Sequence, residues 1–299
     1  MEENIDFVLI VPTHNRHDSI SYSMEYYNNC GFDVIYVDSS ECEYLYAKNQ
    51  YANITYVYFK GMDFSGKLLR ILEKVSSKYV GLCADDDFLI LDRIFLGISF
   101  LQGQEIIKAY IGANYGINRE NSNQIIPLNE SIDCEYLRGD TEKYFLDYTM
   151  ILWGLYNKEA FYKAIKIIEK SDFENDNFIE LTLGTILLIE GGIKRVSTPL
   201  LVREIGQSDN WGLRHKHLTQ DDLTIKMDFQ KIRNTINSVY GDDYFTEAFT
   251  AYISGIEDKV KNNNLYTKLK RHIKKRYRLW VENKKEIYIP IKEIFSKKN

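Results

Sequence analysis

Residues 79–87 read YVGLCADDD, and the fold prediction starts from them. The first six residues of this stretch form a short apolar run, the pattern of a buried β-strand, and this run continues directly into Asp85, Asp86 and Asp87. Three adjacent carboxylates repel one another, so clustering them costs stability unless a cation or a ligand compensates the charge. The stretch therefore predicts a strand that delivers acidic side chains to a binding site.

The acidic triplet has the chemistry of a metal site. Carboxylate oxygens suit Mg²⁺ or Mn²⁺, which usually bind through one or two carboxylates together with the phosphates of a substrate. In an extended segment Asp85 and Asp87 face the same side. The alternative is an ordinary acidic turn that also caps the helix after it. Because the triplet follows a buried strand, we favour the metal site.

Three more strand patterns precede this stretch, separated by helix patterns. The apolar runs are residues 6–11 (DFVLIV), 33–37 (DVIYV) and 54–59 (ITYVYF), and helices are expected at residues 19–29, 43–50 and 64–75. Short buried strands that alternate with helices indicate a mostly parallel, Rossmann-like sheet with right-handed crossovers. We therefore expect the α/β fold class.

Polar residues follow the ends of the predicted strands. Thr13, His14, Asn15 and Arg16 follow the first strand, and Asp38 follows the second. Ligands bind such sheets at the carboxyl ends of the strands, so we expect these residues to meet the acidic triplet at one edge. For His14 and Arg16 the alternative is turn capping and a surface ion pair.

The remainder of the chain is less regular up to about residue 220 and helical beyond it. We expect strands at residues 109–116, 153–157, 193–196 and 200–203, helices at residues 158–168 and 177–189, and a polar loop at residues 118–133. From about residue 221 to residue 286 the pattern is helical. We place a domain boundary near residue 220, between an α/β domain (1–220) and a helical C-terminal extension (221–299).

Three short motifs resemble, in their residues and their spacing, the signature of family 2-type glycosyltransferases with the glycosyltransferase A fold. They are VPTHNR at residues 11–16, VDSS at residues 37–40 and ADDD at residues 84–87. The resemblance covers residues 5–210. The sequence CADDDF at residues 83–88 is similar to a bacterial surface-polysaccharide subgroup of the family. It implies a metal-dependent, inverting transfer from a nucleoside-diphosphate sugar, with UDP favoured, to a saccharide or lipid-linked acceptor.

The resemblance also implies which residues bind the nucleotide-sugar donor. They come from the turn after the first strand, the end of the second strand, the helix before the acidic triplet, the triplet itself and a late strand: Pro12, Thr13, Asn15, Arg16, Asp38, Lys67, Asp85, Asp86 and Arg203. For Lys67 the alternative is an exposed helix lysine. Asp38-Ser39-Ser40 stands where the family has Asp-Asp-Gly-Ser, and residues 63–67 (DFSGK) replace an Asn/Gly-rich helix start, so the base and the sugar stay open.

The same resemblance implies a Mn²⁺ or Mg²⁺ ion at the acidic triplet. Asp85 and Asp87 would hold the ion. In this family a histidine late in the chain can complete the coordination shell of the metal. His215 and His217 are the candidates for that role, with a solvated loop histidine as the alternative.

The acceptor hydroxyl needs a base, because it is a poor nucleophile until its proton is taken. The base must stand on the far side of the sugar carbon from the diphosphate, which excludes Asp85 and Asp87. In the resembling family an acid near the start of a helix in this region is the base, and Asp176 and Glu180 lie there one helical turn apart. We choose Glu180, because its apolar neighbours suggest burial that raises its pKa. Asp176 is the second choice, because a helix N-terminus lowers the pKa of a carboxyl group.

Composition and charge narrow the class of protein. The chain has 299 residues, 44% of them apolar, and its four cysteines show no metal-like spacing. The N-terminus has no signal pattern, and no apolar run approaches the roughly 18–20 residues that cross a bilayer. We therefore expect a reduced, cytoplasmic protein, soluble or peripheral on the inner face of the membrane.

The C-terminal tail is strongly basic. Residues 259–299 carry 14 Lys and Arg against 3 Glu, so the tail is +11 and the rest of the chain is −16. Residues 266–280 (YTKLKRHIKKRYRLW) read as a basic amphipathic helix with an aromatic end, which suits an anionic membrane surface. The alternative is a helix whose apolar stripe packs on the rest of the protein. We expect no nucleic-acid partner, because the rest of the chain is acidic.

Two other functions fit parts of the sequence. A sugar-nucleotide pyrophosphorylase shares the general architecture, but it would open with a Gly-rich phosphate loop that residues 11–18 lack. A catalytically inactive binding module of a polysaccharide-assembly complex is the other alternative, and the intact acidic triplet argues against it.

Overall fold

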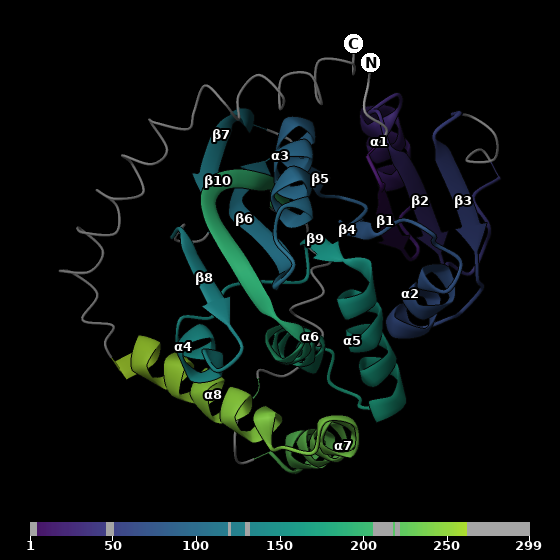
Figure 1. The fold of residues 1–299 in the computed structure, drawn as a ribbon. Coiled ribbons are helices and arrows are strands. Elements are labelled where there is room, and N and C mark those ends of the chain that lie inside the picture. Colours follow the sequence, from purple (N-terminus) through teal and green to yellow (C-terminus); the bar gives the residue numbers. More distant parts are fainter. Residues whose placement is uncertain are drawn as a thin grey trace.

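The computed structural model describes residues 5–45, 51–118, 121–128, 132–205, 218 and 222–261. These residues form one sheet with helices packed around it (Figure 1). The α/β class that the alternating patterns predict is confirmed, and so is a helical part at the C-terminal end.

The first half of the sheet is parallel and is built from the four predicted apolar runs. They form β1 (Phe7–Thr13), β2 (Asp33–Asp38), β3 (Ile54–Tyr58) and β4 (Tyr79–Leu82). Every residue of β1 and β4 is buried, as expected for parallel strands covered on both faces. β1 pairs with β2 and β4, and β2 pairs with β3. The predicted helices are confirmed as α1 (His17–Tyr27) and α2 (Phe64–Leu72).

The second half of the sheet is mixed. β9 (Gly154–Asn157) runs antiparallel to β4 and to β6 (Ile107–Asn118), and β10 (Gly192–Ile205) runs parallel to β6. Three short strands pair antiparallel beside them: β5 (Phe88–Leu89) and β8 (Cys134–Leu137) with β10, and β7 (Asn121–Pro127) with β6. The main order is β3-β2-β1-β4-β9-β6-β10-β5, so the reversed β9 separates the parallel half from the rest.

Two sequence-based expectations for the second half are wrong in detail. Residues 118–133 are not a loop throughout, because β7 lies within them. Its sequence, NSNQIIP, lacks the alternation that reveals a half-buried strand. The strands expected at residues 193–196 and 200–203 are one strand, β10, whose register with β6 shifts around Pro199. Proline has no N–H for the ladder, which explains the interruption in the pattern.

Six more helices lie in the described part of the chain: α3 (Leu91–Gln102), α4 (Thr141–Leu146), α5 (Lys158–Ser171), α6 (Asn177–Glu190), α7 (Leu223–Tyr240) and α8 (Tyr244–Lys261). α5 and α6 confirm the helices predicted at residues 158–168 and 177–189. Nearly all of α6 is buried, because it lies between strands β6 and β10 and helices α5 and α8. An apolar surface on all sides is what such a position requires.

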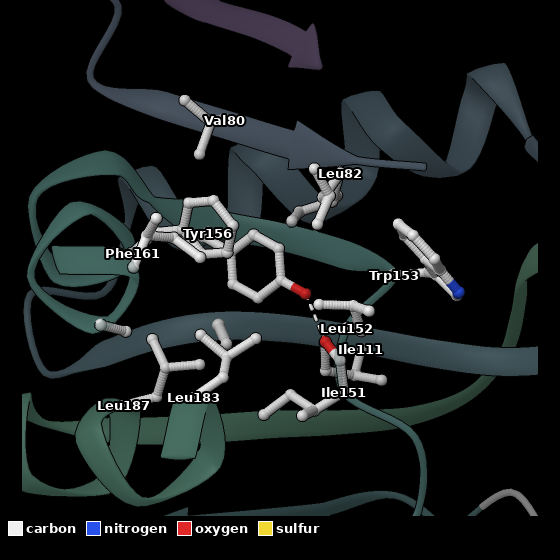
Figure 2. Packing of buried hydrophobic residues seen from close by; sticks show 14 of the residues in the cluster. Val80, Leu82, Ile111, Ile151, Leu152, Trp153, Tyr156, Phe161, Leu183 and Leu187 are labelled. Atoms are coloured by element: carbon white, nitrogen blue, oxygen red, sulfur yellow. Dashed lines mark hydrogen bonds between the residues drawn. The ribbon is translucent and has the colours of Figure 1, made fainter. Parts of the chain in front are cut away.

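The core beneath β9 fixes the backbone that leads into this strand. The ring of Tyr156 stacks on Phe161 of α5 at a centroid distance of 4.5 Å, and its hydroxyl donates to the carbonyl of Ile151 (Figure 2). Figure 2 shows this ring with Leu82 of β4 on one side and Leu183 of α6 on the other. The hydrogen bond and the packing together hold the segment before β9 in place.

The C-terminal helices pack against the rest of the molecule (Figure 1). α8 contacts α4 and α6, and α7 contacts α5. Asp228 of α7 is 1% exposed and accepts hydrogen bonds from the N–H groups of Glu174 and Asn175 at 3.1 and 3.0 Å. Lys231 Nζ donates to the carbonyl of Asp172 at 2.7 Å. α7 therefore holds the segment that leads into α6. The domain boundary near residue 220 stays a prediction.

Two expected helices fall wholly or mostly outside the described residues. They are the basic segment at residues 266–280 and most of the helix expected at residues 43–50, of which the structure describes only residues 43–45. Membrane contact by the tail thus stays a prediction. Within the described ranges, no helix has the length and apolar character needed to cross a membrane.

We expect Asp228→Ala to lower the free energy of unfolding by about 1–3 kcal/mol, because two backbone N–H groups lose their buried acceptor. Asp228→Asn should lose less, since an amide oxygen can still accept. Urea denaturation measures both. Lys226→Ala, on the exposed side of the same helix, is the control and should change the value by less than about 0.5 kcal/mol. An Asp228→Ala variant as stable as this control would contradict the role of the contact.

Candidate functional site

The loops after β1 and β2 are joined at the carboxyl edge of the parallel strands. Thr13, the last residue of β1, donates its hydroxyl to Asp85 Oδ2 at 2.6 Å. Asn15 has a φ of 55°, which asparagine tolerates better than most residues. Its N–H donates to Ser40 Oγ at 2.7 Å, and its Oδ1 accepts from the N–H of Glu41 at 3.1 Å. The structure thus brings the predicted strand ends together.

The acidic triplet forms a turn, not the extended segment considered from the sequence. The N–H of Asp87 donates to the carbonyl of Ala84 at 3.3 Å, which reverses the chain at Asp85 and Asp86. Those two side chains share one cation: Arg16 Nη1 lies 3.4 Å from Asp85 Oδ1 and 2.6 Å from Asp86 Oδ2. The alternation that would put Asp85 and Asp87 on one side therefore does not apply.

Asp87 has a separate set of partners from β10. Its Oδ2 accepts from Arg203 Nε at 3.0 Å, and its Oδ1 accepts from the N–H of Glu204 at 3.1 Å. Burial raises the pKa of Asp87 even though the Arg203 guanidinium opposes the shift. Burial, with Asp86 next to it, likewise raises the pKa of Asp85 to about 6. Both acids are therefore costly to keep ionised, which is typical of a functional site.

Asp38 is fully buried and its carboxylate already has four partners. Oδ1 accepts from the N–H and the hydroxyl of Ser40 at 2.8 and 2.5 Å. Oδ2 lies 2.6 Å from the Tyr56 hydroxyl and 3.2 Å from His17 Nε2. The ring of His17 also packs on Tyr44 at a centroid distance of 5.0 Å. The sequence does not single out His17 or Tyr56. Binding of the nucleotide-sugar donor by Asp38 stays a prediction, and these partners are the groups that would have to share the carboxylate.

Lys67 is buried between the two acidic positions, so the alternative of an exposed helix lysine is wrong. It is 3% exposed, and its Nζ donates to the carbonyl of Thr13 at 2.7 Å and to Ser39 Oγ at 3.1 Å. Burial lowers its pKa to about 8, while the charges of Asp38 and Asp85 oppose the shift. Lys67 is therefore an internal counter-charge for both acids.

A cavity of about 510 Å³ opens beside this network, lined by the end of the β1 turn, the first turn of α1 and the loop after β2. Its lining residues are Asn15, Arg16, His17, Asp18, Ser19, Glu41 and Cys42. Pro12 lies inside β1, is buried and pairs with Val37. His14 faces Ser39, with Nδ1 3.1 Å from the Ser39 carbonyl. Of the predicted turn residues, Asn15 and Arg16 are those that line the cavity.

Glu180 lies on a different segment but within electrostatic reach of the acidic edge. Its Oε2 accepts from the Tyr148 hydroxyl at 2.5 Å, and its Oε1 accepts from the N–H of Leu152 at 3.3 Å. Burial raises the pKa of Glu180, while these donors and the positive charge of Arg203 oppose the shift. Arg203 contacts Asp87, so its charge acts on both carboxyl groups. Asp176 is the N-cap residue of α6, one turn earlier.

The side chains suit a divalent cation in their chemistry, although they form no ready-made cage. Among the described residues, no group of three or more His, Cys, Asp or Glu side chains is arranged to hold a metal. Mg²⁺ commonly binds through one or two carboxylates plus substrate phosphates, and each carboxylate oxygen here has a second lone pair. Asp85 and Asp87 are therefore suitable ligands. His215 and His217 lie outside the described residues, so their metal role stays a prediction.

Comparison with known proteins finds no matching family model and no matching curated protein. Among solved structures, the chain is similar to S. aureus TarS 1–349 in complex with UDP-GlcNAc, with a TM-score of 0.57 and 12% identity over 87% of this chain and 76% of that chain. The same TarS segment in complex with UDP gives a TM-score of 0.46 and 12% identity, over 87% of this chain and 92% of that chain. The first of these matches shows that this chain shares its fold with TarS.

We expect Lys67→Met to lower the free energy of unfolding by about 2–4 kcal/mol. The variant leaves two buried acids without their shared cation and removes one hydrogen bond each from the Thr13 carbonyl and the Ser39 hydroxyl. Arg70→Met, on the exposed side of the same helix, is the matched control and should have little effect. Chemical denaturation at pH 7 compares the two variants. Equal stabilities would mean that Lys67 does not balance the buried acids.

Proposed function

We propose that this chain is a glycosyltransferase that uses a nucleoside-diphosphate sugar, with UDP favoured, and passes the sugar to a saccharide or lipid-linked acceptor in bacterial polysaccharide synthesis. The observation that carries the proposal is the convergence of buried acids and cations at one edge of the sheet: Asp38, Asp85, Asp87, Arg16, Lys67 and Arg203. The fold shared with TarS, which was solved with UDP-GlcNAc, supports a ligand of the same class.

The cavity beside α1 is the proposed place of the nucleotide part of the donor. It lies at the N-terminal turn of α1, where backbone N–H groups favour an anion. Arg16 lines this cavity and contacts Asp85 and Asp86, so a diphosphate bound there would lie next to the acidic triplet. Arg16 and Arg203 are the cations that could stabilise the negative charge that builds on the leaving diphosphate.

A divalent cation, Mn²⁺ or Mg²⁺, would be held by Asp85 and Asp87. When bound, it supplies positive charge to the leaving diphosphate. Arg16 and Arg203 now balance these two acids, so they are the side chains whose contacts would change when the ion binds.

Glu180 is the proposed base for the acceptor hydroxyl. It comes from α6 and not from the strand ends, and the charge of Arg203, which contacts Asp87, also acts on it. A carboxylate with a raised pKa takes a proton more readily at neutral pH. Transfer in which an ionised carboxylate assists direct attack on the sugar carbon inverts the configuration at that carbon.

Product analysis tests the reaction. Wild-type protein with its donor and acceptor should release free nucleoside diphosphate. Release of pyrophosphate instead would identify a pyrophosphorylase, and donor binding without turnover for any acceptor would identify an inactive binding module.

We expect Asp87→Asn to stay folded and to lose most transfer, because the amide oxygen can still accept one of the two hydrogen bonds but cannot supply the negative charge that a cation needs. Asp92→Asn, an exposed acid nearby in the chain, is the control and should stay active. Release of nucleoside diphosphate with added Mn²⁺ measures both variants. Full wild-type activity in excess chelator would exclude the metal part of the proposal.

Glu180→Gln should reduce transfer by about 10²–10⁴-fold, because the hydroxyl loses its base, while donor affinity stays unchanged. Asp176→Asn should retain most of the activity. Steady-state rates and donor titrations separate the two effects. If Asp176→Asn is inactive and Glu180→Gln is not, the base is Asp176. If both variants are active, α6 does not supply the base.

A further inference from the structure

Both oxygens of the Glu180 carboxylate have fixed donors. The Tyr148 hydroxyl contacts Oε2 at 2.5 Å, and the N–H of Leu152 contacts Oε1 at 3.3 Å. Each oxygen has a donor in a defined direction, and the backbone of Ile151 adds a further hydrogen bond to the carboxylate, so the remaining lone pairs are also directed. A base works only when a lone pair points at the proton that it takes. These donors therefore decide where Glu180 can act.

Tyr148 is itself held by aromatic side chains from two helices. Its ring stacks on Phe145 of α4 at 6.0 Å, and it lies edge-on to Tyr144 of α4 at 6.1 Å and to Tyr252 of α8 at 5.2 Å. Aromatic pairs of this kind stabilise the position of the ring by more than the burial of their apolar area alone contributes. The C-terminal helix α8 thus supports the carboxylate through Tyr148.

The second donor is held just as firmly. The carbonyl of Ile151 accepts from the Tyr156 hydroxyl in the core (Figure 2). Leu152 is the next residue, so the direction of its N–H group is set by that buried bond. The Glu180 carboxylate is therefore held by the Tyr148 side chain and by the backbone at Ile151 and Leu152.

We propose that Tyr148 is a positioning residue for Glu180: its hydroxyl orients the carboxylate and keeps it ionised for proton abstraction. This inference rests on the proposed transfer reaction and on Glu180 as its base. Loss of the hydroxyl should therefore lower the fraction of Glu180 that is ionised at a given pH and leave the binding of the donor unchanged.

The groups that face Glu180 come from several elements. They are Tyr144 of α4, Tyr156 of β9, Tyr252 of α8 and Arg203 of β10, with Asp176 one turn earlier on its own helix. Burial raises the pKa of each of these phenols, so they stay neutral at physiological pH. Burial also raises the pKa of Glu180, and the Tyr148 hydroxyl is first among the groups that lower it. Without that hydroxyl, the pKa of Glu180 should rise further.

The test is the pH profile of kcat/KM for Tyr148→Phe. A base acts only when ionised, so a higher pKa moves the acid limb of the profile to higher pH. We expect the acid limb to shift by about one pH unit. The free energy of a hydrogen bond to a charged group typically changes the pKa of that group by about this amount. The rate on the acid limb should fall about tenfold and recover at high pH, with an unchanged KM for the donor. Tyr252→Phe removes a phenol oxygen from the same cluster, and its acid limb should not move.

A second readout does not depend on activity. Infrared difference spectra of the wild type against its Glu180→Gln variant isolate the carboxyl C=O band of Glu180. The intensity of this band follows the protonation of the group. The band should titrate at higher pH in a Tyr148→Phe background. An unmoved titration, or a rate that is lower at every pH with an unmoved acid limb, would overturn the positioning role while leaving the proposed function in place. Absence of transfer by the wild type would overturn the proposed function, and this inference with it.

Discussion

The burial of acidic side chains at the ends of β2 and β4 is the constraint on which the rest of the site depends. Asp38, Asp85 and Asp87 are each at most 4% exposed. An ionised carboxylate in such a place is costly unless it has cations and hydrogen-bond donors. Different segments supply them: Arg16 from the turn after β1, Lys67 from α2 and Arg203 from β10. Distant parts of the chain are therefore bound to one edge of the sheet.

The same arrangement gives the site two sides. One side carries the cavity, Arg16 and the acidic triplet, which suit a diphosphate. The other side carries Glu180, held by groups that depend on α4, β9 and α8. α7 adds to this support, because Asp228 anchors the segment that leads into α6. The C-terminal helices thus contribute to the acceptor side of the proposed site.

Local sequence patterns predict the parallel half of the fold and the acidic edge, because each polar group directly follows an apolar strand. Contacts between segments far apart in the chain are not visible in this way. The pairing of His17 and Tyr56 with Asp38, and of Tyr148 with Glu180, depends on packing across 18 or more positions. The turn at the acidic triplet is one of two alternatives that the sequence leaves open, because adjacent acids suit a turn and an extended segment equally well. β7 was missed because its polar composition resembles that of a loop.

The central claim is that this acidic edge binds a nucleoside-diphosphate sugar, and thermal unfolding tests it most directly. A ligand that binds only the folded state raises the unfolding midpoint, by an amount equivalent to about 2.7 kcal/mol at a hundredfold excess over its Kd. We expect UDP-GlcNAc or another nucleotide sugar to raise the midpoint of the wild type, with Mn²⁺ present, and Asp85→Asn to abolish the rise. If no nucleotide sugar changes the midpoint at millimolar concentration, the account is contradicted.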